Sequence, residues 1–426
     1  MLMSYLDEIS EYIRTGESDD TNLGLEIEHF IINDEGVQIG FHEISELIDK
    51  VGRELGAEII YMDHFPVGYY TGEYSTSLEP SCQFEISINP YSDLKTIEGI
   101  YREFRSIWDP IFAKKGYHFE TKGNLPLVET GAITPDDIPL SPKKRYKYMD
   151  EYFKKSGKYG KYMMRASGSA QVSIDYKSEE DMVKKLTVLE KIAPVFMIMM
   201  ENKTDATSTL SGAEDKPHLF RTQQWDDLDP ARTGFVPHSL DADFGYDKMA
   251  EVIAGTPLIL LTDEGETRDV GSNTARDLIE GNVIKWDNLS AGRRKRLIEH
   301  FMSMGFFHFR VKKYIEIRVA DSVPLDKALG YVALIKGLVY SEKNLNLLDE
   351  ILSDVNDVKT IQQAVEAIER DGFDAEIYNG RTAGEWAEHL YSLADGALGK
   401  EDREYLKGVR AFWSNSEQKN KDKQPA

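Results

Sequence analysis

The feature that most constrains this sequence is a run of alternating side chains from Leu23 to Asn33. Aliphatic residues such as Leu25 and Ile27 alternate there with Glu26 and Glu28. Because successive side chains of a β-strand point to opposite faces, the run predicts a strand with one apolar face and one acidic face. Two carboxylates on one face repel each other and stay ionised together only in water or around cations. One such strand alone is typical of a solvated surface.

The same alternation returns in three later segments. Four strands with a polar face of this kind are harder to explain as an ordinary solvated surface than one strand is. We predict strands over Ser77–Ile88, Ser169–Asp175 and Tyr314–Val319. Glu79 precedes a proline and is expected on an extended approach to the first of them. The polar faces of the four strands would carry Glu26, Glu28, Gln83, Glu85, Ser87, Gln171, Ser173, Asp175, Glu316 and Arg318.

Acids from four distant segments on one face of a sheet indicate either a cation site or accidental surface charge. Carboxylate oxygens on a rigid sheet suit Mg²⁺ or Mn²⁺, which prefer oxygen ligands and share them with phosphates. The sequence contains neither GxxxxGK[ST] nor GxGxxG, so a bound nucleotide triphosphate would be neutralised by metal ions and arginines instead of a glycine-rich loop.

Charge and cysteine content restrict the partners and the compartment. The formal net charge of −23 argues against nonspecific nucleic-acid binding and against an anionic membrane surface. The single cysteine, Cys82, excludes an intramolecular disulfide and fits a reducing compartment. The most apolar run, Ile192–Met200, is too short to span a bilayer, and the N-terminus lacks a secretory signal. We therefore expect a soluble, cytoplasmic protein.

The remaining chain predicts helices around the sheet, and hence an α+β fold. Helical periodicity covers about residues 2–14, 43–55, 93–115 and 178–200. Residues 202–245 form a long aperiodic stretch, which is usually functional or disordered. Residues 1–325 are expected to form the catalytic α+β region, 326–413 a helical part of the same domain, and 414–426 a disordered tail.

Five segments of this sequence resemble the glutamate–cysteine ligases of the plant type, a family that also occurs in bacteria. They stand in the family's order, and the resemblance covers about residues 20–325. The segments are Gly24–Phe30 (GLEIEHF), Ser77–Ser87 (SLEPSCQFEIS), Arg165–Tyr176 (RASGSAQVSIDY), Arg221–Gly234 (RTQQWDDLDPARTG) and Tyr314–Asp321 (YIEIRVAD).

The resemblance implies a glutamine synthetase-like fold, in which a curved, mostly antiparallel sheet forms a cup with helices outside. It also implies a reaction of glutathione biosynthesis. ATP phosphorylates the side-chain carboxylate of L-glutamate, and the amine of L-cysteine then attacks the acyl phosphate. The implied cofactor is Mg²⁺, as two or three ions with Mn²⁺ possible, and the implied assembly is a monomer or homodimer.

Roles follow from the resemblance for each matching residue. The implied metal ligands are Glu26, Glu28, Glu79, Glu85, Glu316 and the neutral Gln171. Arg318 is the implied catalytic partner of Glu316, and with Glu28 it would serve ATP, because a guanidinium fork suits phosphate. The implied substrate-binding residues are Arg221 and Arg232 for the glutamate α-carboxylate, Trp225 for the shape of that pocket, and Arg165, Tyr148 and Tyr152 for the amine substrate.

Several of these residues have an equally good structural explanation. Tyr148 and Tyr152 are spaced as core-packing residues would be, and His29 and Asp175 are expected to be structural hydrogen-bonding groups. Cys82 and Val319 stand where the family has glycine, so the local backbone could differ there. The redox-switch cysteines of the plant enzymes are absent, so thiol regulation is not expected.

Two other functions remain open at this stage. One is a related ATP-dependent carboxylate–amine ligase with a different amine acceptor, because a thiol pocket leaves little signature in a sequence. The other belongs to a different class: a non-catalytic relative that binds a nucleotide or a metal. The intact set of acids together with Arg318 argues against the second.

Overall fold

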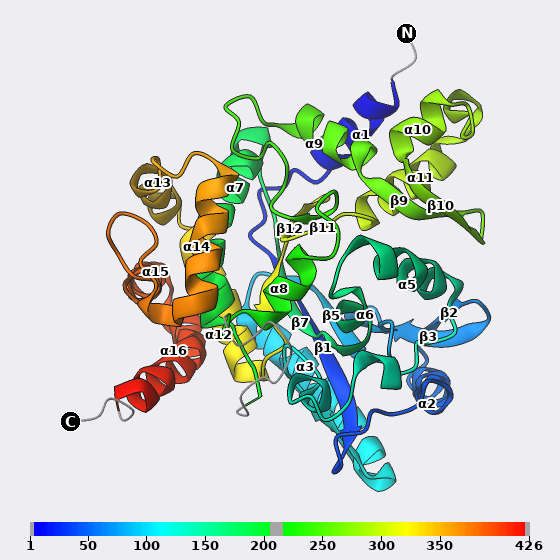
Figure 1. The fold of residues 1–426 in the computed structure, drawn as a ribbon, viewed down its shortest axis with the longest axis horizontal. Helices are drawn as coiled ribbons and strands as arrows, with labels where there is room; N and C mark the ends of the chain where they lie inside the picture. The colour runs from blue at the N-terminus through cyan, green and yellow to red at the C-terminus, as the bar shows by residue number, and fades with distance from the viewer. Residues whose placement is uncertain (1–3, 205–215, 422–426) are drawn as a thin grey trace.

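The computed structural model describes residues 4–204 and 216–421, with side chains described as far as Arg410. A nine-stranded sheet, in which neighbouring strands pair antiparallel, lies at the centre of the described chain (Figure 1). Its strands are β1 (Leu23–Asn33), β2 (Glu58–Met62), β3 (Phe65–Tyr70), β4 (Tyr74–Leu78), β5 (Phe84–Tyr91), β6 (Tyr117–Glu120), β7 (Ser169–Ile174), β12 (Phe309–Val311) and β13 (Ile315–Asp321). They are ordered β12-β13-β7-β1-β5-β4-β3-β2, and β6 pairs with the far end of β1. The sheet is open, as the edge strands β12 and β2 show.

Two smaller sheets flank the main one. β9 (Pro257–Asp263) and β10 (Glu266–Thr274) form a hairpin, whereas β8 (Thr233–Gly234) pairs in parallel with β11 (Phe306–Phe307). The helices that surround the sheets are α1 (Tyr5–Arg14), α2 (Phe41–Glu54), α3 (Leu94–Lys115), α4 (Pro126–Glu129), α5 (Lys144–Ser156), α6 (Gly160–Ala166), α7 (Glu179–Met199), α8 (Phe220–Asp226), α9 (Tyr246–Gly255), α10 (Ala275–Glu280), α11 (Ala291–Ser303), α12 (Leu325–Val339), α13 (Glu342–Ile351), α14 (Val358–Asp371), α15 (Ala383–Ala397) and α16 (Lys400–Lys421). Short 3₁₀ turns lie at Pro135–Asp137, Trp286–Asn288 and Gly372–Asp374.

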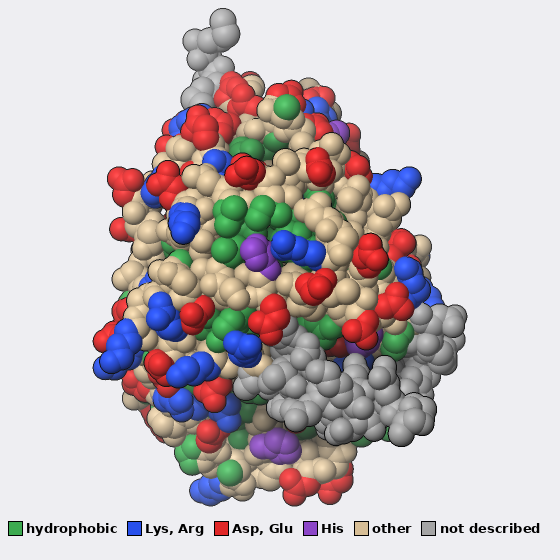
Figure 2. All heavy atoms as spheres, turned by 90° about the vertical axis from the view of Figure 1, so that its left-hand side faces the viewer, with side chains coloured by type: hydrophobic (Ala, Val, Ile, Leu, Met, Phe, Trp, Pro, Cys, Tyr) green, Lys and Arg blue, Asp and Glu red, His purple; other side chains and the backbone are tan. Residues whose placement is uncertain are grey.

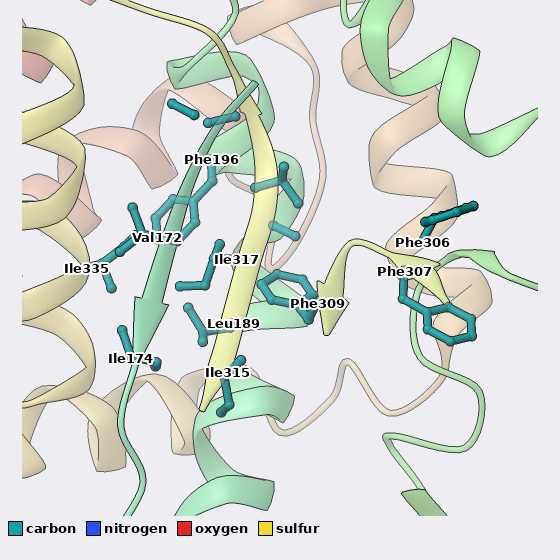
Figure 3. Close-up of a cluster of buried hydrophobic side chains, with 14 of the residues drawn as sticks. Val172, Ile174, Leu189, Phe196, Phe306, Phe307, Phe309, Ile315, Ile317 and Ile335 are labelled. Atoms are coloured by element: carbon teal, nitrogen blue, oxygen red, sulfur yellow. The ribbon is translucent and has the colours of Figure 1, made fainter. Parts of the chain in front are cut away.

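The apolar face of the sheet is buried beneath helices, as the alternating pattern predicted. Val172 of β7 and Ile317 of β13 lie beside Leu189 and Phe196 of α7, and Ile335 of α12 joins the same cluster (Figure 3). All five side chains are at most 1% exposed. This packing leaves only the other face of the sheet free for a site, and the α+β prediction with a mostly antiparallel sheet is confirmed.

Helix ends follow the local signals in the sequence. The carboxylate of Asp93 accepts a hydrogen bond from the Thr96 amide at the start of α3, and Gly116 ends that helix with a left-handed φ of 80°. At the start of α7 the Ser178 hydroxyl accepts a hydrogen bond from the Asp181 amide. The boundaries predicted for these two helices are therefore confirmed to within a residue or two.

The predicted strand over Ser77–Ile88 is wrong as a single element. The chain reverses after Leu78, and β4 and β5 pair antiparallel with Leu78 opposite Phe84. The turn begins at Glu79, whose carbonyl accepts a hydrogen bond from the Cys82 amide. Pro80 presets the backbone of this turn, and Cys82 closes it with a left-handed φ of 69°. The backbone therefore adopts the glycine-like conformation although a cysteine occupies the position.

The C-terminal helices pack on α7 and α12, at the left of Figure 1. The residues expected to be a disordered tail from Ser414 onward begin inside α16, whose backbone is helical to Lys421; residues 422–426 lie outside the described chain. Glu, Gln and Lys in this stretch are good helix formers, which accounts for the extension. Among helices of the described residues, none is both long and apolar enough to cross a membrane.

Acidic and basic side chains are interspersed on the molecular face shown in Figure 2. The negative charge drawn on this face is of the solvated kind. Glu26, Glu28 and Glu85 on the polar sheet face differ from it because they are half-buried and lie on paired strands. That difference identifies them as the part of the charge that needs an explanation.

A buried carboxyl in α7 gives the fold a testable pH dependence. Glu190 accepts a hydrogen bond from the Val236 amide at 2.9 Å and is also bonded to the Ser239 hydroxyl. Burial raises the pKa of Glu190 to about 8. Because the folded-state pKa exceeds the unfolded one, its contribution to stability is complete below about pH 4.5 and is lost as the pH rises through 8.

We predict that Glu190→Gln, which mimics the protonated carboxyl, has the same free energy of unfolding as the parent at pH 4 and a higher one at pH 9. The gain would reach at most about 5 kcal/mol, from a shift of roughly 3.5 pKa units. Urea unfolding at both pH values measures it, with Glu366→Gln on the exposed face of α14 as the control. Equal pH dependence in the two variants would contradict the assignment.

Candidate active site

A cavity of about 290 Å³ lies over the polar face of the main sheet. Strands β1, β5, β7, β12 and β13 supply one wall, and α5, α6, α8 and β11 supply most of the other. The lining is mainly charged and polar, with Met149, Met163, Trp225 and Phe306 as its larger apolar groups. The full set is Glu26, Glu28, Glu79, Pro80, Gln83, Glu85, Arg145, Tyr146, Met149, Met163, Ser167, Gln171, Trp225, Ser303, Phe306, Arg310, Lys312 and Arg318.

Four of the predicted metal ligands form an acidic cluster in this cavity. Glu28 on β1 stands directly opposite Glu85 on β5, and Glu26 stands opposite Gln171 of β7 on the other side. The turn after β4 adds Glu79. Like charges directly opposite across a sheet are destabilising. Among the described side chains, none forms an ion pair with any of the four glutamates.

Burial and mutual repulsion raise the pKa values of these carboxyls. Burial first, and then Glu79, raises the pKa of Glu28 to about 7. Burial followed by the charges of Glu26, Glu79 and Glu28 holds the pKa of Glu85 well above its ordinary value. The pKa of Glu26 is raised by burial and by Glu316. The cluster is thus short of positive charge and would hold its protons less tightly if a cation were bound.

Hydrogen bonds fix the orientation of the cluster. The Ser169 amide donates to Glu28 Oε2 at 2.8 Å, and the hydroxyls of Ser77 and Ser87 both donate to Glu85 Oε1 at 3.1 Å. These donors are neutral, so they position the carboxylates without cancelling their charge. The remaining oxygen lone pairs face the cavity as hard donors.

Glu316 has a different environment from the other acids. It is 1% exposed, and three cations surround it: Arg310 forms two hydrogen bonds of 2.7 Å, Arg318 Nη1 lies at 2.8 Å and Lys312 Nζ at 3.0 Å. Burial alone would raise the pKa of Glu316, but Arg310, Lys312 and Arg318 outweigh it and hold the pKa well below its ordinary value. The carboxylate lies beneath the three cations, which themselves line the cavity.

Arg318 is aimed into the cavity by a β-bulge. The β13–β7 register shifts between Ile317 and Ala320, so an extra residue is accommodated next to Arg318. Its Nη1 also donates to Gln171 Oε1 at 2.6 Å. The bulge includes Val319, which stands where the family has glycine and where the sequence predicted that the backbone could differ.

The guanidinium groups of Arg221 and Arg318 both lie on the ring of Trp225, at 5.6 and 5.8 Å from its centroid. Arg221 is buried, and both of its terminal nitrogens donate to the Arg318 carbonyl at 3.4 Å. A small adjoining cavity joins these three residues to Phe306. The structure therefore places Trp225 in the lining of the acidic cavity and Arg221 in that of the adjoining one.

Four residues implied to bind substrate do not line the cavity. Arg165 donates to Asp150 at 2.5 Å and to the Ile138 carbonyl, and its side chain is buried. Arg232 is fully buried against Asp229 and the Met304 carbonyl. A buried guanidinium is stable only when it is paired, which accounts for both arrangements.

The two tyrosines of α5 have structural positions. The hydroxyl of Tyr152 donates to Asp229 at 2.9 Å, and its ring lies beneath the guanidinium of Arg232. Tyr148 packs against the hydrophobic core. The cavity-facing residues of α5 are instead Arg145, Tyr146 and Met149, so the helical face differs from the one expected.

The predicted structural roles of His29 and Asp175 are confirmed. The ring nitrogens of His29 bond to the Phe84 carbonyl and the Tyr101 hydroxyl, and the Asp175 carboxylate accepts a hydrogen bond from the Asn22 amide. Burial lowers the pKa of His29 to about 3, which keeps its ring neutral. Neither side chain lines the cavity.

Sequence reasoning named Arg318 but missed the other basic residues of the site, Arg145, Arg310 and Lys312. Arg310 alternates with Phe309 and Val311, the same period-two signal that marked the other strands, and a short turn leads on to Ile315. The hairpin was therefore readable. The contributions of Arg145, Met163, Ser303 and Phe306 had no comparable signal, because they come from helices and a two-residue strand brought close only by the fold.

The residues present fit divalent cations. Glu26, Glu28, Glu79 and Glu85 are oxygen donors that have no cationic partner among the described residues, and their charges raise one another's pKa. Within the described chain no three acid, histidine or cysteine side chains are already gathered around one point. Oxygen donors of this kind suit ions that share their coordination with substrate phosphates.

Comparison with known proteins shows first the fold and then the family. The fold matches the solved structure of a glutamate–cysteine ligase from Francisella tularensis in complex with AMP, with a TM-score of 0.50 at 14% identity, over 93% of this chain and 82% of that one. The model of glutamate-cysteine ligase family 2 matches residues 22–419. The chain belongs to this family.

Plant glutamate–cysteine ligases are among the relatives of this chain. The chloroplastic glutamate–cysteine ligase of Medicago truncatula is 27% identical over 363 residues, which are 82% of this chain and 67% of the relative. The chloroplastic ligase B of Oryza sativa subsp. japonica is 26% identical over 322 residues, 74% of this chain and 62% of the relative. The matched part thus spans between three fifths and two thirds of these longer proteins.

We predict that Glu85→Gln stabilises the metal-free protein. Glutamine keeps the acceptor oxygen for Ser77 and Ser87 but removes one charge from the acidic cluster. Because the pKa of Glu85 is raised, the gain grows as the pH rises above the unfolded-state value, reaching on the order of 1 kcal/mol.

Thermal unfolding in a chelating agent at pH 6 and pH 8.5 measures this effect. Glu58→Gln, an exposed acid on β2 of the same sheet, is the matched control. A lower melting temperature for Glu85→Gln at pH 8.5 would show that the acidic cluster is not repulsive.

Proposed function

We propose that this protein ligates the γ-carboxylate of L-glutamate to the amine of L-cysteine in an ATP-dependent reaction that gives γ-glutamylcysteine, ADP and phosphate. The observation that supports it most is the cavity itself. The acidic cluster, which has no ion-pair partner among the described residues, shares the cavity with a basic cluster of Arg310, Lys312 and Arg318. A metal–nucleotide complex has both signs of charge and is complementary to such a cavity. Membership of the glutamate–cysteine ligase family supports the same reaction.

The two parts of the cavity would have separate tasks. Glu26, Glu28, Glu79 and Glu85 would hold Mg²⁺, with Glu316 and Gln171 available once their present partners move. Bound Mg²⁺ would neutralise phosphate charge and polarise the phosphoryl oxygens. Arg318 would contact the phosphates, and its guanidinium offers two parallel donors to adjacent oxygens.

Arg221 and Trp225 would bind the α-carboxylate end of glutamate. Both lie beside Arg318, so the γ-carboxylate of a bound glutamate would reach toward the phosphate region. Arg165, Arg232, Tyr148 and Tyr152 would support the walls of the site instead of touching substrate, because their polar groups have protein partners or pack in the core.

Chemistry at this site would consist mainly of positioning and charge stabilisation. The γ-carboxylate oxygen attacks the terminal phosphorus of ATP and ADP leaves, which forms an acyl phosphate. The amine then attacks the acyl carbon, phosphate leaves, and the nitrogen loses a proton. An acyl phosphate is sufficiently activated that orientation contributes most of the remaining rate enhancement.

The amine substrate is decided by a comparison of acceptors. Phosphate release is measured with ATP, Mg²⁺ and glutamate, and each amino acid is added in turn. We expect cysteine to give the fastest release. If cysteine is no faster than alanine or 2-aminobutyrate, the protein is a ligase for another amine; if no acceptor stimulates release, it is a non-catalytic relative.

We predict that Glu316→Gln lowers turnover by roughly 100-fold or more while the protein stays folded, because glutamine cannot serve three cations and a metal ion as a carboxylate does. Steady-state kinetics measure the loss, and circular dichroism checks the fold. Glu58→Gln serves again as the charge-matched control. A wild-type rate in Glu316→Gln would show that Glu316 has no part in the reaction.

A further inference from the structure

The carboxylate of Glu316 has no free lone pair in this structure. Oε1 accepts from Arg310 Nη2 and Arg318 Nη1, and Oε2 accepts from Arg310 Nε and lies 3.0 Å from Lys312 Nζ. A carboxylate offers about four acceptor positions, so all are used. Glu316 can therefore bind a metal ion only if at least one of these cations leaves it.

The three cations exceed what one carboxylate requires. Three positive charges around one negative charge leave an excess of two, on side chains that are 14% (Arg310), 26% (Lys312) and 12% (Arg318) exposed. Arg318 also bonds to Gln171, and the Lys312 ammonium lies 3.2 Å from the Tyr314 hydroxyl. Among the described residues, Arg310 donates side-chain hydrogen bonds to Glu316 alone. A cluster of three cations is also more than the α-carboxylate of an amino acid would need.

Arg310 and Lys312 are well placed to contact a ligand. Both belong to the hairpin that ends the sheet, with Arg310 on β12 directly opposite Glu316 on β13. β12 is an edge strand, so its side chains can move without disturbing another strand. Both residues line the cavity beside Arg318.

We propose that Arg310 and Lys312 bind the phosphates of the nucleotide, and that they pair with Glu316 while no nucleotide is present. When a metal–nucleotide complex binds, Glu316 exchanges the cations for a divalent ion, and Arg310 and Lys312 pass to the phosphate oxygens. The exchange rests on the proposed use of ATP and extends it, because it assigns two residues and a resting state to the site. It also gives the three cations a hydrogen-bonded partner while no nucleotide is present.

This exchange predicts effects of opposite sign on two ligands. Removing one cation relieves its competition for Glu316, so Mn²⁺ alone binds more tightly. The same change removes a charge-assisted bond to phosphate, so the nucleotide binds more weakly, by about tenfold. A residue with a merely structural role would weaken both or neither.

The test uses Arg310→Met and Lys312→Met in the full chain, with circular dichroism as a check on folding. Mn²⁺ binding without nucleotide is measured by electron paramagnetic resonance. Binding of a β,γ-imido ATP analogue at saturating Mn²⁺ is measured by calorimetry. Lys312→Met leaves the two Arg310–Glu316 hydrogen bonds in place and is therefore the decisive variant if Arg310→Met does not fold.

Two controls isolate the effect. Lys313→Met removes the neighbouring charge, whose ammonium lies over the Tyr12 ring and outside the cavity, and should leave both affinities unchanged. Lys312→Arg restores a cation and should return both affinities toward those of the parent. Mn²⁺ affinity that is unchanged or weaker in Lys312→Met, or an unchanged affinity for the analogue, overturns the exchange.

Neither measurement depends on turnover, which separates this inference from the proposed reaction. A parent protein that ligates no amine but shows the opposite shifts would refute the reaction and retain the exchange. A parent that makes γ-glutamylcysteine but shows no opposite shifts would retain the reaction and refute the exchange.

Discussion

Repulsion between Glu28 and Glu85, which face each other across β1 and β5, is the constraint on which the site depends. The arrangement costs stability, and Glu26 and Glu79 increase that cost. It persists because the opposite face of β5 is buried beneath α3 and that of β1 beneath α12, where close packing of apolar side chains holds the backbone in place. The sheet thus has one face that stabilises the fold and one that holds repelling carboxylates close together, where a cationic ligand would relieve the repulsion.

The basic cluster complements this acidic one within a single cavity. Glu316 pairs with Arg310, Lys312 and Arg318. Glu28 and Glu85 instead accept hydrogen bonds from neutral donors. Both environments are built on one face of the same sheet. Only β7 lies between β1, where the pKa of Glu26 is raised, and β13, where the pKa of Glu316 is lowered. A ligand that brings both divalent cations and phosphates matches the two environments together.

Much of this arrangement was readable before the fold was known. The alternation around Glu26, Gln171 and Glu316 predicted which side chains share a face, and the strands confirm it. The errors have physical causes. The strand expected over Ser77–Ile88 contains a tight turn at Pro80, and the sequence did not show that Arg165 and Arg232 pair with buried acids.

By itself, the sequence determined the two-faced strands, the helices that cover them and the family, because side-chain periodicity and short motifs are local properties. Only the tertiary structure decided which charges meet. Glu316 is 145 residues from Gln171 in the chain, and both contact Arg318, an arrangement set by strand order and by the bulge after Ile317. Electrostatic energies fall with distance in space and not along the chain, so the pairing of acids with cations could be known only once the sheet was assembled.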